Sequence, residues 1–211
     1  GSPSSQGTPS SQGSPSSQST PSEIKSAESI QSPVEASPVE FDRTNIESIL
    51  AAMKKHADNA TVQVSACEAL FEVCGGAKDA KKPNQELVES LGGVDLILSA
   101  MSKFSNNASV QQWACAALRS VCYYSEHIVT SIASKGGIEL VLQALKTHPK
   151  DPVVQYRACS ALRSMSYSNN QNCSTIMRLG GLDMVLIAMR SYPNDPLVQQ
   201  HCCVVLLNLT Y

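Results

Sequence analysis

Along most of this chain, apolar residues recur at the spacing of one face of a helix. One segment has them at positions i, i+4, i+7, i+8 and i+11, namely Val154, Ala158, Ala161, Leu162 and Met165. Three other segments share this core frame: Val62, Ala66, Ala69, Leu70 and Val73; Val110, Ala114, Ala117, Leu118 and Val121; Val198, Cys202, Val205, Leu206 and Leu209. The pattern predicts four helices that bury equivalent faces.

Glycine pairs divide the same pattern at a fixed spacing. Gly92-Gly93, Gly136-Gly137 and Gly180-Gly181 each precede an apolar segment, and successive pairs lie 44 residues apart. Each core frame opens with a Val-Gln pair, and these pairs are Val62-Gln63, Val110-Gln111, Val154-Gln155 and Val198-Gln199. The last three pairs keep the step of 44, and the first lies 48 residues before the second. A period in this range is typical of a helical solenoid.

Capping residues give each cycle three helices: a short one, a middle one and a third that carries the core frame. Asn107, Asp151 and Asp195 are expected at N-cap positions. A proline directly follows each of the two aspartates, at the first position of the helix. The first glycine of each pair is expected to end the short helix with a positive φ. We expect repeats at 42–76, 82–124, 126–168 and 170–211, the first without its short helix. A loop at 75–83 would absorb the four extra residues.

The first forty residues differ in composition from the rest. They contain a six-residue repeat of Ser, Pro, Gln and Gly that offers little apolar surface to bury, so we expect a disordered tail at 1–40 and a folded domain at 41–211. Six Ser-Pro or Thr-Pro pairs make proline-directed phosphorylation one hypothesis, and a plain flexible linker the other. The pairs begin at Ser2, Thr8, Ser14, Thr20, Ser32 and Ser37.

Charge and cysteine content narrow the class of protein. The net charge of −2 divides into −3 for residues 1–40 and +1 for the remainder, and neither value indicates a nucleic-acid or membrane-surface partner. The eight cysteines include no CxxC pair, and four of them recur at one repeat position, where a small apolar residue fits a helix interface. These four are Cys67, Cys115, Cys159 and Cys203. Free buried thiols at these positions would indicate a protein of a reducing compartment. With no run of membrane-spanning length and no signal-peptide core, we expect a cytoplasmic protein, or one both cytoplasmic and nuclear.

With its Gly-Gly turn, apolar middle helix and third helix of the form VQxxACxALRSM, the chain resembles the armadillo-repeat family over residues 42–211. HEAT repeats, the rival architecture, usually lack the Gly-Gly pair. The resemblance implies an all-α fold, a right-handed armadillo-type helical solenoid of about four repeats, preceded by the disordered tail. It also implies a protein-interaction scaffold or adaptor that holds an extended partner segment in a concave groove lined by the third helices.

Transferred by position, the groove would present Arg157, Ser160, Ser164 and Tyr167, which lie on one helical face beside the core frame. The equivalent residues are Ser65, Glu68, Glu72 and Gly75; Trp113, Ala116, Ser120 and Tyr123; His201, Val204, Asn208 and Tyr211. Arg119 and Arg163 would add two cations. Because aromatic and arginine side chains are common binding anchors, we expect an acidic or phosphorylated segment. The alternative to a binding role is a structural one. In that case the tyrosines pack under the loop that leads to the next short helix, and the arginines cover this loop.

Other functions find less support in the residues. Importin-alpha-like arrays place Trp and Asn at the second and third groove positions, and only Asn208 matches, which disfavours a nuclear-import adaptor. No nucleophile and base, paired carboxylates or phosphate loop occurs at usable spacing, so we expect no enzyme, no cofactor and no metal site. One alternative is that these repeats are the targeting or regulatory region of a larger kinase, small-GTPase regulator or cytoskeletal protein.

The last third helix offers an apolar face with no following repeat. We expect Val205, Leu206 and Leu209 to be left partly uncovered. A longer array, self-association through this helix, or use of the face as a binding site would each account for it.

Overall fold

A computed structural model describes residues 39–75 and 78–210 of the chain. The tail expected at 1–40 therefore lies, except for its last two residues, outside the described part. Within that part the fold is all-helical, with eleven α-helices and no strand.

The helices follow the predicted cycles. The first cycle has two helices, α1 (Ile46–Lys55) and α2 (Ala60–Gly75). The second has α3 (Lys78–Ser90), α4 (Gly93–Lys103) and α5 (Ala108–Cys122). The third has α6 (Glu126–Ser134), α7 (Gly137–Thr147) and α8 (Pro152–Ser166), and the fourth has α9 (Asn170–Arg178), α10 (Gly181–Ser191) and α11 (Pro196–Leu209).

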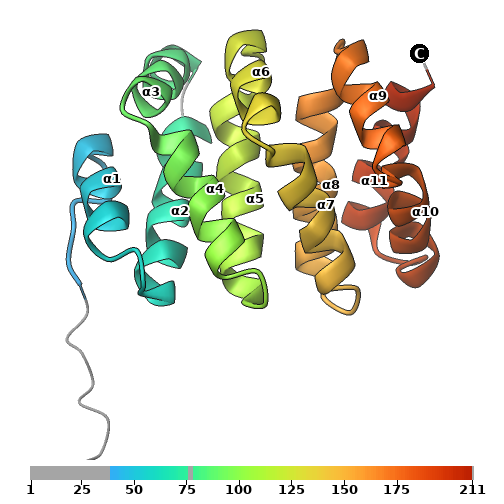
Figure 1. Ribbon diagram of the computed structural model, residues 1–211, viewed down its shortest axis with the longest axis horizontal. Coiled ribbons are helices and arrows are strands. Elements are labelled where there is room, and N and C mark those ends of the chain that lie inside the picture. The colour runs from blue at the N-terminus through green and yellow to red at the C-terminus, as the bar shows by residue number, and fades with distance from the viewer. Residues whose placement is uncertain (1–38, 76–77, 211) are drawn as a thin grey trace, which may run out of the picture. The chain divides into compact units, whose positions relative to one another are not determined.

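Equivalent helices stack side by side from one repeat to the next (Figure 1). The third helices α2, α5, α8 and α11 form one layer with the most extensive contacts, and α1, α4, α7 and α10 form the other. The short helices α3, α6 and α9 lie at one end of these layers (Figure 1). Each repeat thus contacts mainly its neighbours, as in other solenoids.

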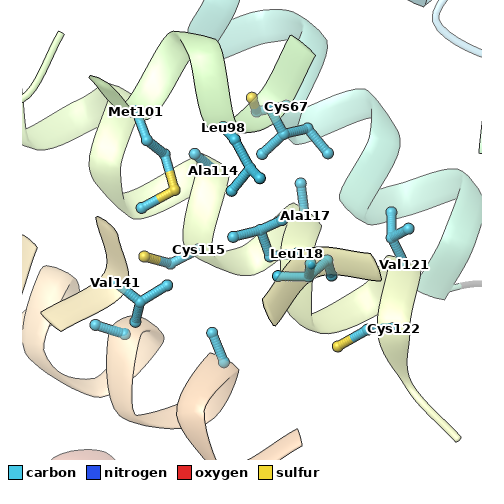
Figure 2. Close-up of a cluster of buried hydrophobic side chains, with 14 of the residues drawn as sticks. Cys67, Leu98, Met101, Ala114, Cys115, Ala117, Leu118, Val121, Cys122 and Val141 are labelled. Atoms are coloured by element: carbon cyan, nitrogen blue, oxygen red, sulfur yellow. The ribbon is translucent and has the colours of Figure 1, made fainter. Parts of the chain in front are cut away.

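The core runs between the two layers and follows the predicted frame. Leu70, Leu118 and Leu162, at equivalent positions of three third helices, are completely buried. Figure 2 shows the core around Leu118, where residues of α5 pack against Cys67 and against Leu98 of α4. Within the frame only Val73, Leu206 and Leu209 are half-buried. The hydrophobic period therefore identified the buried face correctly.

The glycine pairs and caps form as expected. Gly92, Gly136 and Gly180 have φ values of 76°, 80° and 75°. Asp151 and Asp195 accept hydrogen bonds from backbone N–H groups at the start of α8 and α11, whose first residues are prolines. The glycine pairs therefore mark the starts of α4, α7 and α10, and the Asp-Pro pairs mark the starts of α8 and α11.

The expected loop at 75–83 is wrong for most of its length. Gly75 ends α2, and α3 already begins at Lys78, so Pro83 lies inside a helix. Pro83 is the sixth residue of α3, so it removes one backbone hydrogen bond close to the helix start, whereas the lysines and the alanine before it favour the helical conformation.

A ladder of glutamines, buried in the first three repeats and half-buried in the fourth, joins the third helix to the middle helix in every repeat. Gln155 donates from Nε2 to the carbonyl oxygens of Leu145, at 2.9 Å, and His148, at 3.0 Å. Gln63, Gln111 and Gln199 make the equivalent pairs of bonds. Carbonyls at a helix C-terminus lack intrahelical partners, so these glutamines satisfy the end of each middle helix.

We expect Gln155→Ala to lower the free energy of unfolding by about 1–3 kcal/mol, because two hydrogen bonds in a buried setting are lost. Urea unfolding followed by circular dichroism measures the change. Gln143→Ala, at an exposed site of α7, is the matched control and should stay within about 0.5 kcal/mol of the wild type. Equal stability of the two variants would contradict a structural role for the ladder.

The last helix departs from the expected pattern at two positions. Val205, expected to be uncovered, is completely buried, whereas Leu206 and Leu209 are half-buried. Cys203 is exposed although its equivalents Cys67, Cys115 and Cys159 are buried. The reason is neighbour packing: Cys202 of α11 covers Cys159 at an Sγ–Sγ distance of 3.4 Å, and no described helix does the same for Cys203.

Candidate partner-binding face of the third helices

The third helices α5, α8 and α11 carry an unusual set of charges. Within their bounds they contain no aspartate or glutamate, but they contain Arg119, Arg157, Arg163 and His201. In the described part of the chain, none of the three arginines forms an ion pair. The residues predicted to line the groove on α5, α8 and α11 are called the third-helix face below.

Arg157 lies across the ring of Trp113 on the neighbouring helix. Its guanidinium carbon is 3.8 Å from the centroid of the indole ring, and its Nε donates to the hydroxyl of Tyr156 at 3.1 Å. Trp113 is half-buried against the core, and the ring of Phe71 on α2 lies 5.9 Å away. Stacking on an aromatic face fixes the arginine without neutralising its charge.

Beside this stack is a pocket of about 120 Å³, called the arginine pocket. Side chains from four third helices contribute to it: Phe71, Ala116, Arg119, Tyr156, Arg157, Ser160 and His201. Three of its polar atoms are buried and have no hydrogen-bond partner among the described residues, and these are Nη1 of Arg157, Oγ of Ser160 and Nδ1 of His201. Such atoms are costly in a folded protein and call for an explanation.

His201 occupies the α11 side of the arginine pocket. Its ring stacks on that of Tyr156 at a centroid distance of 6.2 Å and an interplanar angle of 22°. Burial lowers the pKa of His201, and the positive charges of Arg119 and Arg163 lower it further. The imidazole is therefore neutral at pH 7, so that either ring nitrogen can carry the proton.

A second pocket, of about 60 Å³, lies where α5 and α8 end. It is lined by Tyr123, Tyr124, Arg163, Ser164 and Tyr167 and is called the tyrosine pocket. Tyr123 and Tyr167 are the C-caps of their helices, and each is followed by a residue with positive φ, Tyr124 at 58° or Ser168 at 49°.

The tyrosine rings form a chain of edge contacts that remains open to solvent. The ring of Tyr124 lies 4.3 Å from that of Tyr123 and 6.0 Å from that of Tyr167. Tyr124 is 78% exposed and Tyr167 is 59% exposed. Arg119 connects the two pockets, since it lines the arginine pocket and its guanidinium lies 5.9 Å from the ring of Tyr123.

The structure distributes the predicted groove residues between these pockets and the interior. Arg119, Arg157, Ser160 and His201 line the arginine pocket, and Trp113 supports it. Tyr123, Arg163, Ser164 and Tyr167 line the tyrosine pocket.

Three predicted residues lie elsewhere. Ser120 is buried, and its carbonyl oxygen accepts a hydrogen bond from Gln85 at 2.6 Å. Asn208 donates its amide to the carbonyl of Arg163 and to Oγ of Ser166, so it is engaged within the domain. Tyr211 lies outside the described residues.

Sequence analysis missed Phe71, Tyr124 and Tyr156. Tyr156 and Tyr124 lie next to the predicted Arg157 and Tyr123, but their repeat equivalents are Gln112 and Ser168, so no periodicity points to them. Phe71 is equivalent to Arg119 and reaches the pocket only because neighbouring third helices cross closely. The doubled aromatics at 123 and 124 were the one local indication available.

The neighbouring third helix α2 is different, because the acidic residues at its equivalent positions are already paired. Arg43, from the segment before α1, lies 2.9 Å from Glu68 and 3.4 Å from Glu72. Glu68 and Glu72 are the repeat equivalents of Ser160 and Ser164. The free positive charge of the face is thus concentrated on α5 and α8.

The described residues contain no group of three or more His, Cys, Asp or Glu side chains that could hold a metal ion. No single described helix is long and apolar enough to cross a membrane, and α6 and α7 pass that test only together, across a bend of 70°.

Together, the stacked three-helix repeats, the Gly-Gly turns and the ladder of third helices define an armadillo-type repeat protein, a class that generally serves as protein-interaction scaffolds. The chain belongs to the LRRK2 ARM repeat family, whose model matches residues 86–211. No curated protein sequence matches it.

Solved structures with the same fold include engineered proteins. Two crystal structures from the Northeast Structural Genomics Consortium superpose on 78% of this chain with TM-scores of 0.66 and 0.67, at 22% and 21% identity. A third covers 79% of this chain with a TM-score of 0.66 at 21% identity. The chain spans 62%, 63% and 38% of those proteins, so it is shorter than each, and the likeness concerns the fold alone.

Proposed function

We propose that the third-helix face of α5, α8 and α11 binds an extended, acidic segment of a protein partner in the groove of the solenoid. The observation that carries the proposal is the group of Arg119, Arg157 and Arg163, which lie beside aromatic rings and lack carboxylate partners in the described part of the chain. Domains usually pair or fully hydrate such charges.

The physical chemistry of the face suits this partner. Guanidinium groups bind carboxylates through two parallel hydrogen bonds, and arginine and tyrosine are enriched among residues that dominate binding energy. The exposed Tyr124 and Tyr167 add flat apolar surface at small entropic cost. An uncompensated positive face also accelerates association with an acidic chain.

The proposal is tested by selecting peptides from a displayed library of extended sequences against residues 39–211. Acidic residues should be enriched among the peptides bound. Arg163→Ala combined with Tyr167→Ala should weaken binding at least about tenfold, because one charged hydrogen bond and one anchoring ring are lost. Fluorescence anisotropy with a selected peptide measures the affinity.

The matched control changes the opposite layer, with Gln143→Ala combined with Arg190→Ala on α7 and α10. This control should bind like the wild type. The Arg163 and Tyr167 variant should keep the wild-type melting transition, since Tyr167 is largely exposed. Unfolding of that variant would show the tyrosine to be structural, and unchanged affinity would place the binding surface elsewhere.

The alternative of a targeting or regulatory region within a larger protein uses the same face. The family's description as a repeat supports this organisation, because a repeat region contributes binding rather than chemistry. The peptide experiment applies to it without change.

A further inference from the structure

We infer that the arginine pocket binds the phosphoryl group of a phosphorylated side chain, through Arg157, Ser160 and His201. This inference rests on the proposed function, because it assigns one residue of the bound segment to one pocket of the third-helix face.

The first argument is the set of unpartnered atoms. Nη1 of Arg157, Oγ of Ser160 and Nδ1 of His201 line one pocket, come from α8 and α11, and have no partner among the described residues. Ser160 is only 3% exposed, so bulk water does not readily satisfy its hydroxyl. Polar atoms that lack a hydrogen-bond partner and gather around one cavity are the atoms to which a ligand would hydrogen-bond.

The second argument is charge. Arg157 and Arg119 both line the pocket, and none of its lining residues is acidic. Arg157 is held in place by the ring of Trp113 and by the hydroxyl of Tyr156, which orient its guanidinium without supplying a negative charge. The pocket therefore selects an anion. The orientation of the Arg157 guanidinium is set before the anion binds.

The third argument favours a phosphoryl group over a carboxylate. Four donors, from Arg119, Arg157, Ser160 and His201, surround the cavity, and a phosphoryl group offers three strong acceptor oxygens and nearly two negative charges. A carboxylate offers two oxygens and one charge. The cavity of about 120 Å³ exceeds the roughly 10–15 Å³ that one water requires, so a tetrahedral group has room.

His201 adds a coupling between binding and protonation. Burial keeps its pKa low, and the charges that lower it further belong to Arg119 on α5 and Arg163 on α8, while α9 and α10 contribute none. A bound anion would offset these charges. The pKa of His201 should therefore be higher in the bound state than in the free protein, and an NMR titration of its ring with and without the anion measures this rise.

The experiment uses the full chain with inorganic phosphate, O-phosphoserine and serine as probes, at constant ionic strength. NMR signals of the His201 ring and of the Ser160 amide should shift saturably with phosphate and O-phosphoserine and stay in place with serine. Arg157→Gln should weaken O-phosphoserine binding about tenfold, as expected for a lost charged hydrogen bond. The control Arg190→Gln, on α10, should have no effect.

Ser160→Ala separates a ligand-binding role from a structural one. Because the hydroxyl has no partner among the described residues, its removal should leave the melting temperature unchanged or raise it, while phosphate binding weakens. A lower melting temperature with unchanged phosphate binding would overturn the inference, as would signals that shift linearly without saturation.

The two proposals fail separately. If unphosphorylated acidic peptides bind the third-helix face while phosphate leaves His201 unchanged, the groove stands and the phosphoryl pocket is wrong. If phosphate binds at His201 but the Arg163 and Tyr167 variant keeps full peptide affinity, the groove as proposed is wrong and the anion pocket remains.

Discussion

Replacing Leu162 by alanine should lower the free energy of unfolding by about 2–5 kcal/mol, the usual range for a buried leucine. Leu162 is completely buried in the core between the two layers. Its neighbours belong to stacked helices whose backbones are fixed by caps and glutamine bonds, so they can collapse only partly into the space left behind. Most of the cost of the cavity should therefore remain.

The matched control is Leu207→Ala on α11, where the leucine is 54% exposed. Guanidinium chloride unfolding of both variants under the same conditions gives the comparison. The Leu207 variant should change stability by less than about 1 kcal/mol. A Leu162 variant no less stable than the Leu207 variant would show that the core frame has been assigned to the wrong face.

Gly137→Ala should be the other strongly destabilising change, at about 3 kcal/mol, the upper end of the overpacking range. A β-carbon at this position would lie 2.8 Å from the carbonyl oxygen of Ile132 and would also collide with the side chain of that residue. Part of the clash is with backbone, so α6 and α7 would have to move apart. Thermal melting and chemical unfolding both report the loss.

Gly75→Ala, at another helical glycine, is expected not to destabilise the protein. Its added methyl group would make an ordinary contact, 3.5 Å from Oγ of Ser120. Alanine favours the helix over glycine by up to about 1 kcal/mol, so this variant should be as stable as the wild type or more so. If both variants lose the same stability, the close approach of α6 and α7 does not explain why position 137 is a glycine.

The comparison of the two glycines in each pair shows what the sequence could and could not reveal. The first glycine, such as Gly136, was predicted to have positive φ, because a turn that ends a helix favours that conformation. The second, such as Gly137, is needed for close packing of two helices, and packing distances do not appear in a one-dimensional pattern.

The core frame was predictable for a related reason. Burial along a helix follows a period of 3.6 residues, so Leu162 and its equivalents could be assigned before the structure was known. The hydrogen bonds of Gln155 could not be predicted from the repeated Val-Gln pair, because their acceptors lie at the end of the preceding helix. Side-chain partners depend on tertiary contacts that periodicity does not encode.

The candidate site was predicted in part. Helical geometry places Arg157, Ser160, Ser164 and Tyr167 on one face, and the resemblance to armadillo repeats implies that this face lines the groove. Its division into two pockets does not, because the division arises from Tyr156, which stacks on His201, and from Tyr124, whose backbone turns to positive φ after α5. The unpartnered hydroxyl of Ser160 is likewise a property of the packed structure, since an isolated helix would expose it to water.

The central claim is that the third-helix face binds the partner segment. Its most direct test is to titrate isotope-labelled residues 39–211 with a selected acidic peptide and to map the amide signals that shift. The shifts should cluster on α5, α8 and α11 around Arg163 and Tyr167, and the variant with both residues changed to alanine should lose them. Shifts confined to the middle helices α4, α7 and α10, or shifts that persist unchanged in the double variant, would contradict the account.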